Sequence, residues 1–223
     1  MSSSSPKLAL YAQFAAVAKA MAHAHRLALL ELVAQGERSV EALAEHSGLS
    51  VANASQHLQH LRRAGLVTAR RQGKFVLYCL TDDAVLTMLA AMQKVAERNL
   101  GEVERILRSY FRDRDELEPI SRAELLRRMK RGLVTVLDVR PKDEFGLKHL
   151  PGARNIPLGQ LKRQLSTLDR NTEIIAYCRG PYCVLSFEAV ARLRKLGYKA
   201  RRLEDGLPEW KAAGLPVEAG SVS

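Results

Sequence analysis

The spacing of hydrophobic positions in the first part of the chain predicts several short helices. Apolar residues recur at intervals of three and four, and a glycine follows each segment that shows this spacing. Ser39 and Ser50 precede two of the segments and are typical N-cap residues, because a serine oxygen accepts a hydrogen bond from a free backbone N–H. The expected helices lie within Leu8–Gly36, with a break near Ala22–His25, and over Val40–His46 and Ser50–Ala64.

Two runs rich in β-branched and aromatic residues follow in VTARRQGKFVLYCL. This pattern predicts a β-hairpin with its turn at Arg71–Lys74. A long amphipathic helix is then expected from about Asp82 to Tyr110. Two short helices joined by a tight turn and followed by a basic hairpin are the parts of a winged helix-turn-helix, whose second helix enters the major groove of DNA.

The second half of the chain alternates predicted strands and helices, which is typical of a parallel α/β sheet. The segment RDRDELE, residues 112–118, has mixed charge and no apolar periodicity, which indicates a linker. The sequence therefore predicts two domains, a mainly-α winged helix-turn-helix over 1–111 and an α/β domain with a parallel sheet over 119–223. The second domain is expected to contain helices at Arg122–Arg131, near Asp143, at Leu158–Leu165 and at Val184–Leu196, and strands at Val134–Asp138, Glu173–Tyr177 and Ala200–Leu203.

Composition indicates which partners and which cellular location to expect. The 223 residues carry a net charge of +11 and both halves are basic, so an anionic partner is expected. No apolar run reaches the roughly 20 residues of a membrane span, and the start MSSSSPK does not resemble a signal peptide. Three cysteines do not suit a disulfide framework. We expect a cytoplasmic protein with no membrane contact and no cofactor.

The second short helix, within SVANASQHLQHLRRAG, is the expected DNA-reading element. Asparagine and glutamine pair with adenine edges, and arginine binds bases or phosphates. The residues on the face expected to pack inward are Val51, Ala54, Leu58 and Leu61. The candidate DNA-binding residues are Asn53, Ser55, Gln56, His57, His60, Arg62 and Arg63 in this helix, with Arg70, Arg71 and Lys74 in the hairpin. The alternative interpretation is a small helical domain with a solvated polar face.

Residues 8–105 resemble the ArsR family of dimeric winged-helix repressors. The resemblance rests on AMAHAHRLALLELVAQGERSVEALAEHSGLSVANASQHLQHLRRAGLVTARRQGKFVLYCL, and above all on ASQHLQHLRRAGLV. It implies a homodimer joined through the first and last helices, Leu8–Ala20 and about Leu86–Tyr110. Such a dimer would read double-stranded DNA with a two-fold-symmetric operator.

The ligands of the metal-sensing members of that family are missing from the sequence. Those members carry paired cysteines beside the first DNA-binding helix, or His, Asp and Glu ligands along the last helix, but ERSVEALAEHS has no cysteine and residues 82–110 have no histidine. A soft metal needs two or more thiolates or imidazoles at one point. Cys79 is interpreted as a small core residue in a wing strand. His23 and His25 should point in different directions on a helix and are interpreted as structural, so no metal site is expected.

Cys178 directly follows a predicted buried strand and begins the loop CRGPYC, which leads into a helix. Backbone N–H groups converge on such a loop, and the helix N-terminus adds positive potential. This placement favours a thiolate or a persulfide anion over the neutral form. Arg179 is expected to add a cation beside the sulfur. The loop is therefore the candidate reactive site.

Residues 116–218 resemble the rhodanese family in three ordered motifs, VLDVRPKDEFGLKHLPGARNIPL, YCRGPYC and EDGLPEWKAAGLPVE. The resemblance implies that Cys178 is the catalytic cysteine and that Asp138 and Arg140 brace the active-site region. The full set of candidate catalytic residues is Cys178, Arg179, Cys183, Asp138 and Arg140. Glu144, His149 and Trp210 also match the family and are interpreted as residues that maintain the fold.

The active-site loop departs from the patterns of related enzymes. Phosphatases with the same loop need Cys-x5-Arg to grip phosphate, and Val184 stands at the position of that arginine. Pro181 and Cys183 replace residues common in sulfurtransferases, which argues against efficient thiosulfate turnover, and Cys183 supplies a possible resolving thiol. Side chains of such a loop tend to point outward, and a disulfide needs Cα atoms within about 7 Å. We therefore expect the loop to rearrange before the sulfurs meet.

Three hypotheses for the function stay open. The first is a repressor that senses reactive sulfur, or another thiophilic ligand, through Cys178 and Cys183. The second is a sulfurtransferase that works through a Cys178 persulfide and carries a regulatory DNA-binding domain. The third is a sensor that holds a metalloid between the two thiols. Thiosulfate–cyanide turnover and metalloid titration distinguish them.

Overall fold

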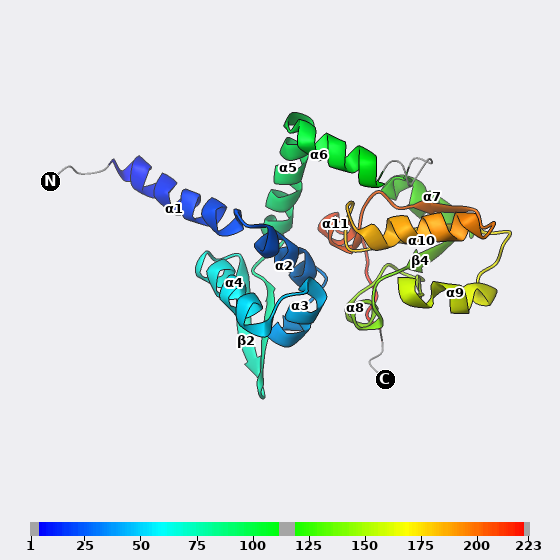
Figure 1. Ribbon diagram of the computed structural model, residues 1–223, viewed down its shortest axis with the longest axis horizontal. Coiled ribbons are helices and arrows are strands. Elements are labelled where there is room, and N and C mark those ends of the chain that lie inside the picture. The colour runs from blue at the N-terminus through cyan, green and yellow to red at the C-terminus, as the bar shows by residue number, and fades with distance from the viewer. Residues whose placement is uncertain (1–4, 112–118, 221–223) are drawn as a thin grey trace. The chain divides into compact units, whose positions relative to one another are not determined.

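A computed structural model describes residues 5–111 and 119–220 of the chain. The chain divides into two compact units, Met1–Val85 and Leu86–Ser223, each with its own sheet (Figure 1). The winged helix-turn-helix and the α/β domain expected from the sequence are both present. The expected linker at 112–118 lies outside the described residues, so the expected domain boundaries stay a prediction.

The helices of the N-terminal unit begin and end close to where the sequence predicts. They are α1 (Pro6–Met21), α2 (Ala24–Ala34), α3 (Val40–Ser47) and α4 (Val51–Arg63). The hydroxyl of Ser39 accepts a hydrogen bond from the N–H of Ala42, and that of Ser50 accepts one from Asn53, so both serines are N-caps. Gly48 follows α3 with a φ of 68°, a left-handed conformation that glycine adopts without strain.

The predicted hairpin is formed by β2 (Val67–Gln72) and β3 (Phe75–Leu80), which pair in antiparallel register. Gly73 lies in the turn between them with a φ of 59°. A short strand, β1 (Arg38–Ser39), adds to the free edge of β3 and was not foreseen. Two residues show no periodicity, so only the pairing with β3 defines this strand.

The long helix expected from Asp82 to Tyr110 is interrupted. Its residues form α5 (Ala84–Asn99), α6 (Gly101–Ile106) and the π-helical segment η1 (Leu107–Phe111). The break lies at Leu100, whose backbone is extended, with φ −109° and ψ 103°. Asn99 turns its amide back to the carbonyl of Val95, and Gly101 is a poor helix former, so the Asn-Leu-Gly sequence explains the interruption.

The C-terminal unit contains a sheet in which the described strands run parallel in the order β5-β4-β6-β7. These strands are β4 (Val134–Asp138), β5 (Arg154–Asn155), β6 (Glu173–Tyr177) and β7 (Ala200–Arg202). The first two strands that the sequence predicts have the expected bounds, and the third ends one residue early. The edge strand β5 was missed because it is only two residues long.

The helices of this unit confirm the predicted alternation with one correction. They include α7 (Arg122–Lys130), α8 (Lys142–Leu147), α10 (Val184–Lys195) and α11 (Leu207–Ala212). The helix expected at Leu158–Leu165 is instead a series of short turns, η3 (Leu158–Gln160), α9 (Leu161–Gln164) and η4 (Leu165–Thr167). Gly159 lowers the helix propensity of this segment. None of the described helices is long and apolar enough to cross a membrane.

The two faces of the sheet are covered by different helices, as Figure 1 shows. Along β6, Ile174 and Ala176 belong to the core that contains residues of α9 and α10. The alternate residues Ile175 and Tyr177 belong to the opposite core, with residues of α7 and α11. Cys178 continues the first series. The strand therefore delivers this cysteine to the α10 face, at the carboxyl end of the sheet.

Candidate functional site

The two cysteines of the C-terminal unit meet in the loop between β6 and α10. Cys178 follows the last residue of β6, and Cys183 is the N-cap residue of α10. A disulfide joins them, with their Cα atoms 6.1 Å apart, and their side chains are 1% and 8% exposed. In this disulfide form the sulfurs are already joined, and the rearrangement expected of the reduced loop stays a prediction. A turn within the loop, in which the N–H of Cys183 donates to the carbonyl of Gly180 at 3.2 Å, brings Cys183 back beside Cys178.

The loop rests on the segment that precedes α11. A Cβ added to Gly206 would lie 2.4 Å from the carbonyl carbon of Arg179 and from the N of Gly180, so only glycine permits this approach. The N–H of Leu207 donates to the carbonyl of Cys178 at 3.3 Å. The motif EDGLPEW carried this signal in its glycine, which was not singled out from the sequence.

A buried cation of β7 also supports the loop. The guanidinium of Arg202 donates to the carbonyl of Pro181 at 3.4 Å and lies over the ring of Phe187, 4.1 Å from its centroid. Its side chain is almost fully buried. Arg202 was not recognised from the sequence, because basic residues are frequent in this segment, KARR, and such residues usually lie on the surface.

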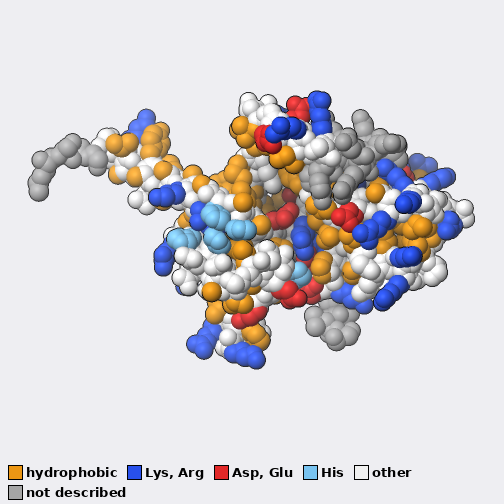
Figure 2. All heavy atoms as spheres, in the orientation of Figure 1, with side chains coloured by type: hydrophobic (Ala, Val, Ile, Leu, Met, Phe, Trp, Pro, Cys, Tyr) orange, Lys and Arg blue, Asp and Glu red, His pale blue; other side chains and the backbone are white. Residues whose placement is uncertain are grey.

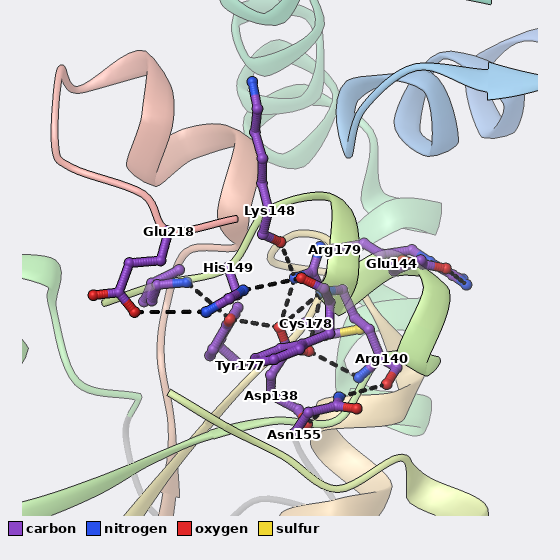
Figure 3. Close-up of polar contacts among 12 residues, drawn as sticks. Asp138, Arg140, Glu144, Lys148, His149, Asn155, Tyr177, Cys178, Arg179 and Glu218 are labelled. Carbon is purple, nitrogen blue, oxygen red and sulfur yellow. Dashed lines mark hydrogen bonds and ion pairs between the residues drawn. The ribbon is translucent and has the colours of Figure 1, made fainter. Parts of the chain in front are cut away.

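Arg179 lies beside Cys178 in the chain, but its charge is already matched. Its Nε lies 3.0 and 3.1 Å from the carboxylate oxygens of Glu144, and its Nη2 lies 2.5 Å from one of them (Figure 3). Glu144 is fully buried in α8, and a buried carboxylate requires such a partner. Arg179 therefore holds the loop to α8, and its expected role as a fixed cation beside the sulfur stays a prediction.

Asp138 and Arg140 brace the end of β4, as the family resemblance implied. Both side chains are fully buried, and the guanidinium of Arg140 binds the carboxylate of Asp138 through Nε and Nη2. Burial by itself would lower the pKa of Arg140, but its hydrogen bonds to Asp138 and the charge of that carboxylate outweigh burial and raise it. Arg140 also donates to the carbonyl of Lys148 at 2.8 Å, which ties the strand to the turn after α8.

Tyr177 completes this network and was missed from the sequence. Its hydroxyl donates to Asp138 Oδ2 at 2.5 Å and accepts the N–H of Leu150 at 3.1 Å (Figure 3). The pKa of Tyr177 is raised well above its ordinary value, first because burial disfavours the phenolate and then because Asp138 is negative. The residue before Cys178 is thereby fixed to β4.

His149 and Trp210 have the structural surroundings expected of them. His149 stacks on Phe145 and shares a hydrogen bond with its carbonyl at 2.9 Å. The indole N–H of Trp210 donates to the carbonyl of Pro216 at 2.8 Å, and the ring is fully buried.

Most of the DNA-binding candidates of α4 occupy its exposed side. Asn53, Gln56, His60, Arg62 and Arg63 are exposed, and Ser55 and His57 are half-buried. Ala54, Leu58 and Leu61 are fully buried, as expected. Val51 is 49% exposed, so its expected inward packing is wrong. It is the first residue of α4, and the core does not cover it. The exposed polar side of α4 fits a helix that enters the major groove.

The basic residues of the β2–β3 hairpin, the wing of the winged helix-turn-helix, differ in whether a carboxylate is paired with them. Arg71 and Lys74 are exposed beside the turn, and Arg71 Nε donates to the carbonyl of Gly73 at 3.1 Å. Arg70, one residue earlier, binds Glu37 through a pair of hydrogen bonds, the longer of which is 2.6 Å. This ion pair reduces the charge that Arg70 can offer to DNA. Arg71 and Lys74 are therefore the stronger phosphate-binding candidates.

Three histidines come together beside α4, and sequence reasoning did not foresee this. His23 precedes α2 as its N-cap rather than lying on the helix, and its Nδ1 accepts the N–H of His25. The ring centroids of His23 and His25 lie 4.5 and 5.8 Å from that of His57. The expectation that His23 and His25 point in different directions assumed that both lie on a helix and is wrong, because His23 has an extended backbone.

The described residues contain no group of three His, Cys, Asp or Glu side chains arranged to hold a metal ion. Cys79, the free cysteine of β3, is half-buried, with its Sγ 3.0 Å from the hydroxyl of Thr68. Its position in a strand of the β2–β3 hairpin is the one expected, but its half-burial differs from the core residue that the sequence predicted.

Comparisons with known proteins match both halves of the chain. A model of the rhodanese-like domain matches residues 121–213, and one described as bacterial regulatory protein, arsR family, matches residues 24–69. The HTH-type transcriptional regulator Rv0324 of Mycobacterium tuberculosis is 44% identical over 215 residues, which cover 96% of this chain and 94% of that protein.

Solved structures resemble each half separately. The homodimeric winged helix-turn-helix DNA-binding domain of a possible ArsR-family regulator from Mycobacterium bovis is 43% identical, over 45% of this chain and 93% of that chain, with a TM-score of 0.41. A rhodanese-related protein from Thermoplasma volcanium is 29% identical, over 46% of this chain and 98% of that chain, with a TM-score of 0.42.

Proposed function

This chain belongs to the ArsR family of DNA-binding transcriptional regulators and carries a rhodanese-like domain, and we propose that Cys178 and Cys183 of that domain sense reactive sulfur. In this proposal the protein is a homodimeric repressor of a two-fold-symmetric operator. A sulfane-sulfur donor, such as a polysulfide, changes the covalent state of the two cysteines. The change alters the affinity of the N-terminal unit for DNA.

The observation that carries the proposal is the 6.1 Å separation of the Cα atoms of Cys178 and Cys183. A thiol at this distance can resolve a persulfide without unfolding of the loop. Cys178 also lies at the end of a buried strand, and Cys183 opens α10, whose N-terminus favours an anion. We expect the pKa of the reduced Cys178 thiol to lie below its ordinary value.

The chemistry proceeds in two balanced steps. The Cys178 thiolate attacks the terminal sulfur of a donor R–S–SH, which forms a Cys178 persulfide and releases the thiol RSH. The Cys183 thiolate then attacks the inner sulfur of the persulfide, which forms the Cys178–Cys183 disulfide and releases hydrosulfide. The two thiols lose two electrons, and the sulfane sulfur gains them.

Coupling to DNA requires that the dithiol and disulfide forms bind the operator with different affinity. The buried contacts of the loop favour such a difference within the C-terminal unit, because Gly206 and Arg202 hold its backbone and a change in the loop must change their contacts too.

The test uses the full chain in reduced and polysulfide-treated form. Mass spectrometry is expected to find a linked Cys178–Cys183 species in the wild type, a bare Cys178 persulfide in Cys183→Ser, and no modification of the loop in Cys178→Ser. Operator affinity should change on treatment of the wild type and stay constant in Cys178→Ser. Cys79→Ser is the matched control and should behave as the wild type.

Two outcomes would replace the proposal. Steady thiosulfate–cyanide turnover, with operator affinity indifferent to the donor, would make the protein a sulfurtransferase with a separate regulatory signal. Binding of arsenite by the reduced thiols, with an effect on operator affinity that polysulfide lacks, would make it a metalloid sensor. A full response of Cys178→Ser to the sulfur donor would exclude the loop as the sensor.

A further inference from the structure

The histidine cluster beside α4 contains two buried nitrogen atoms that lack hydrogen-bond partners among the described residues. His57 Nδ1 and Arg26 Nε are inaccessible to solvent, and neither has a hydrogen-bond partner among residues 5–111 and 119–220. Arg26 is anchored through its Nη2, which donates to the carbonyl of Lys19 at the end of α1. A guanidinium and an imidazole held together in this way lack a compensating anion of their own.

The groups that act on His57 are all basic. The pKa of His57 is lowered below its ordinary value, first by burial and then by the charges of His23, Arg26, His25 and, one turn along α4, His60. His23, His25 and Arg26 lie at the start of α2, which includes its N-cap, and His60 lies on α4. An anion placed at the cluster would reverse this balance and favour protonated His57.

The exposed members of the cluster can donate hydrogen bonds to such an anion. His23 and His25 are exposed. Because Nδ1 of His23 accepts the N–H of His25, the proton of its neutral ring is on Nε2, which is a donor. Figure 2 shows a patch of histidine side chains on the surface of the N-terminal unit.

The position of the patch indicates which anion it meets. His57 directly follows Gln56, and His60 lies one turn further along the exposed side of α4. A helix in the major groove is flanked by the phosphates of both strands, and most protein–DNA hydrogen bonds go to those phosphates. Since no metal-holding arrangement exists among the described residues, the cluster fits an anion better than a cation.

We propose that His23, His25, Arg26 and His57 form a binding subsite for a DNA backbone phosphate, and that His57 takes up a proton when the phosphate binds. The subsite adds a proton-linked contact to the established DNA binding of the family and is independent of the cysteine chemistry. DNA affinity should therefore rise as the pH falls, over a window that begins at the pKa of His57 in the DNA complex and ends at its lower pKa in the free protein.

The test measures binding of the full, reduced chain to a random-sequence DNA duplex by fluorescence anisotropy between about pH 5 and pH 8. As the pH is lowered, the wild-type Kd should fall by up to about tenfold per pH unit for each proton taken up. His57→Gln should lose this dependence, and at low pH the slope of log Kd against log salt should be about one unit smaller than in the wild type. His25→Gln, at an exposed position that leaves the fold intact, should bind more weakly at low pH.

The controls separate the subsite from other causes. His46→Gln, which removes a histidine of α3 outside the cluster, should keep the wild-type pH dependence. Arg71→Ala should weaken binding equally at each pH. An unchanged pH dependence in both His57→Gln and His25→Gln overturns the proposal. A DNA affinity that depends on Zn²⁺ and not on pH also overturns it. So does a pKa of His57 that inorganic phosphate raises and DNA leaves unchanged.

Discussion

Tyr177 shows how one buried hydroxyl group can fix the position of the loop that begins at Cys178. It joins the strand that ends at Cys178 to Asp138 of β4 and to Leu150 in the turn after α8. Removing one partner of a buried hydrogen bond leaves the others unsatisfied. The side chain before the cysteine is therefore a positioning residue, although it does not touch the sulfur.

We expect Tyr177→Phe to destabilise the C-terminal unit by about 1–3 kcal/mol at neutral pH. Tyrosine ionises near pH 10 in an unfolded chain. Because the folded pKa of Tyr177 is higher, its contribution is complete below that pH and declines as the pH rises above it. The deficit of the variant, measured by urea unfolding, should therefore shrink above about pH 10.

Tyr198→Phe is the matched control, because the hydroxyl of Tyr198 donates only to the carbonyl of Leu165, at 3.0 Å, in a half-buried setting. Its loss should be smaller, about 0.5–1.5 kcal/mol. A Tyr177→Phe deficit that stays constant across the alkaline range would contradict the assigned role of the buried phenol.

At the scale of elements, the loop between β6 and α10 depends on the segment before α11. Gly206→Ala would place a methyl group 2.4 Å from the loop backbone, so the loop must move. We expect a loss of about 1–3 kcal/mol, as for other overpacked sites, and slower formation of the Cys178–Cys183 disulfide, measured by mass spectrometry after polysulfide treatment. Gly159→Ala is the control, since a Cβ there meets open space. Disulfide formation at the wild-type rate in Gly206→Ala would disprove this dependence.

Substitutions in α4 and in the β2–β3 hairpin should have different effects on DNA binding. Arg71→Ala removes a phosphate contact, so it should weaken binding to all DNA sequences and lower the salt slope by about one unit. Gln56→Ala should relax the preference for one base per half-site, measured by competition with operator variants. Arg70→Ala should have a smaller effect than Arg71→Ala, because Arg70 is paired with Glu37. Intact specificity in Gln56→Ala, with specificity abolished in Arg71→Ala, would contradict the placement of α4 in the groove.

At the scale of the whole molecule, α1 presents an apolar side that its own unit does not cover. Leu10, Tyr11 and Phe14 are 53–62% exposed and share one face of the helix. The family resemblance implies a dimer joined through this helix. We expect Phe14→Glu to shift the protein to a monomer in sedimentation equilibrium and to weaken operator binding. Gln13→Glu, which adds the same charge at the neighbouring position, should stay dimeric. A dimeric Phe14→Glu would move the interface elsewhere.

Local signals in the sequence determined the elements and the order of the two domains. Serine caps, glycine stops and the spacing of apolar residues act within a few positions, so the helices α3 and α4 and the strands β4 and β6 lie where predicted. The position of Cys178 at the start of a loop between a strand and a helix was also predictable, because strand and helix signals flank it in the sequence.

Only the tertiary structure decided which side chains meet. The pairing of Arg179 with Glu144, of Arg70 with Glu37 and of Tyr177 with Asp138 joins residues more than 30 positions apart, and no local pattern encodes such contacts. The closeness of Cys183 to Cys178 depends on the turn of the loop between them. The gathering of His23 with His57 depends on the break between α1 and α2. Composition and periodicity report the surroundings of a residue along the chain, whereas partners, burial and protonation follow from packing in space.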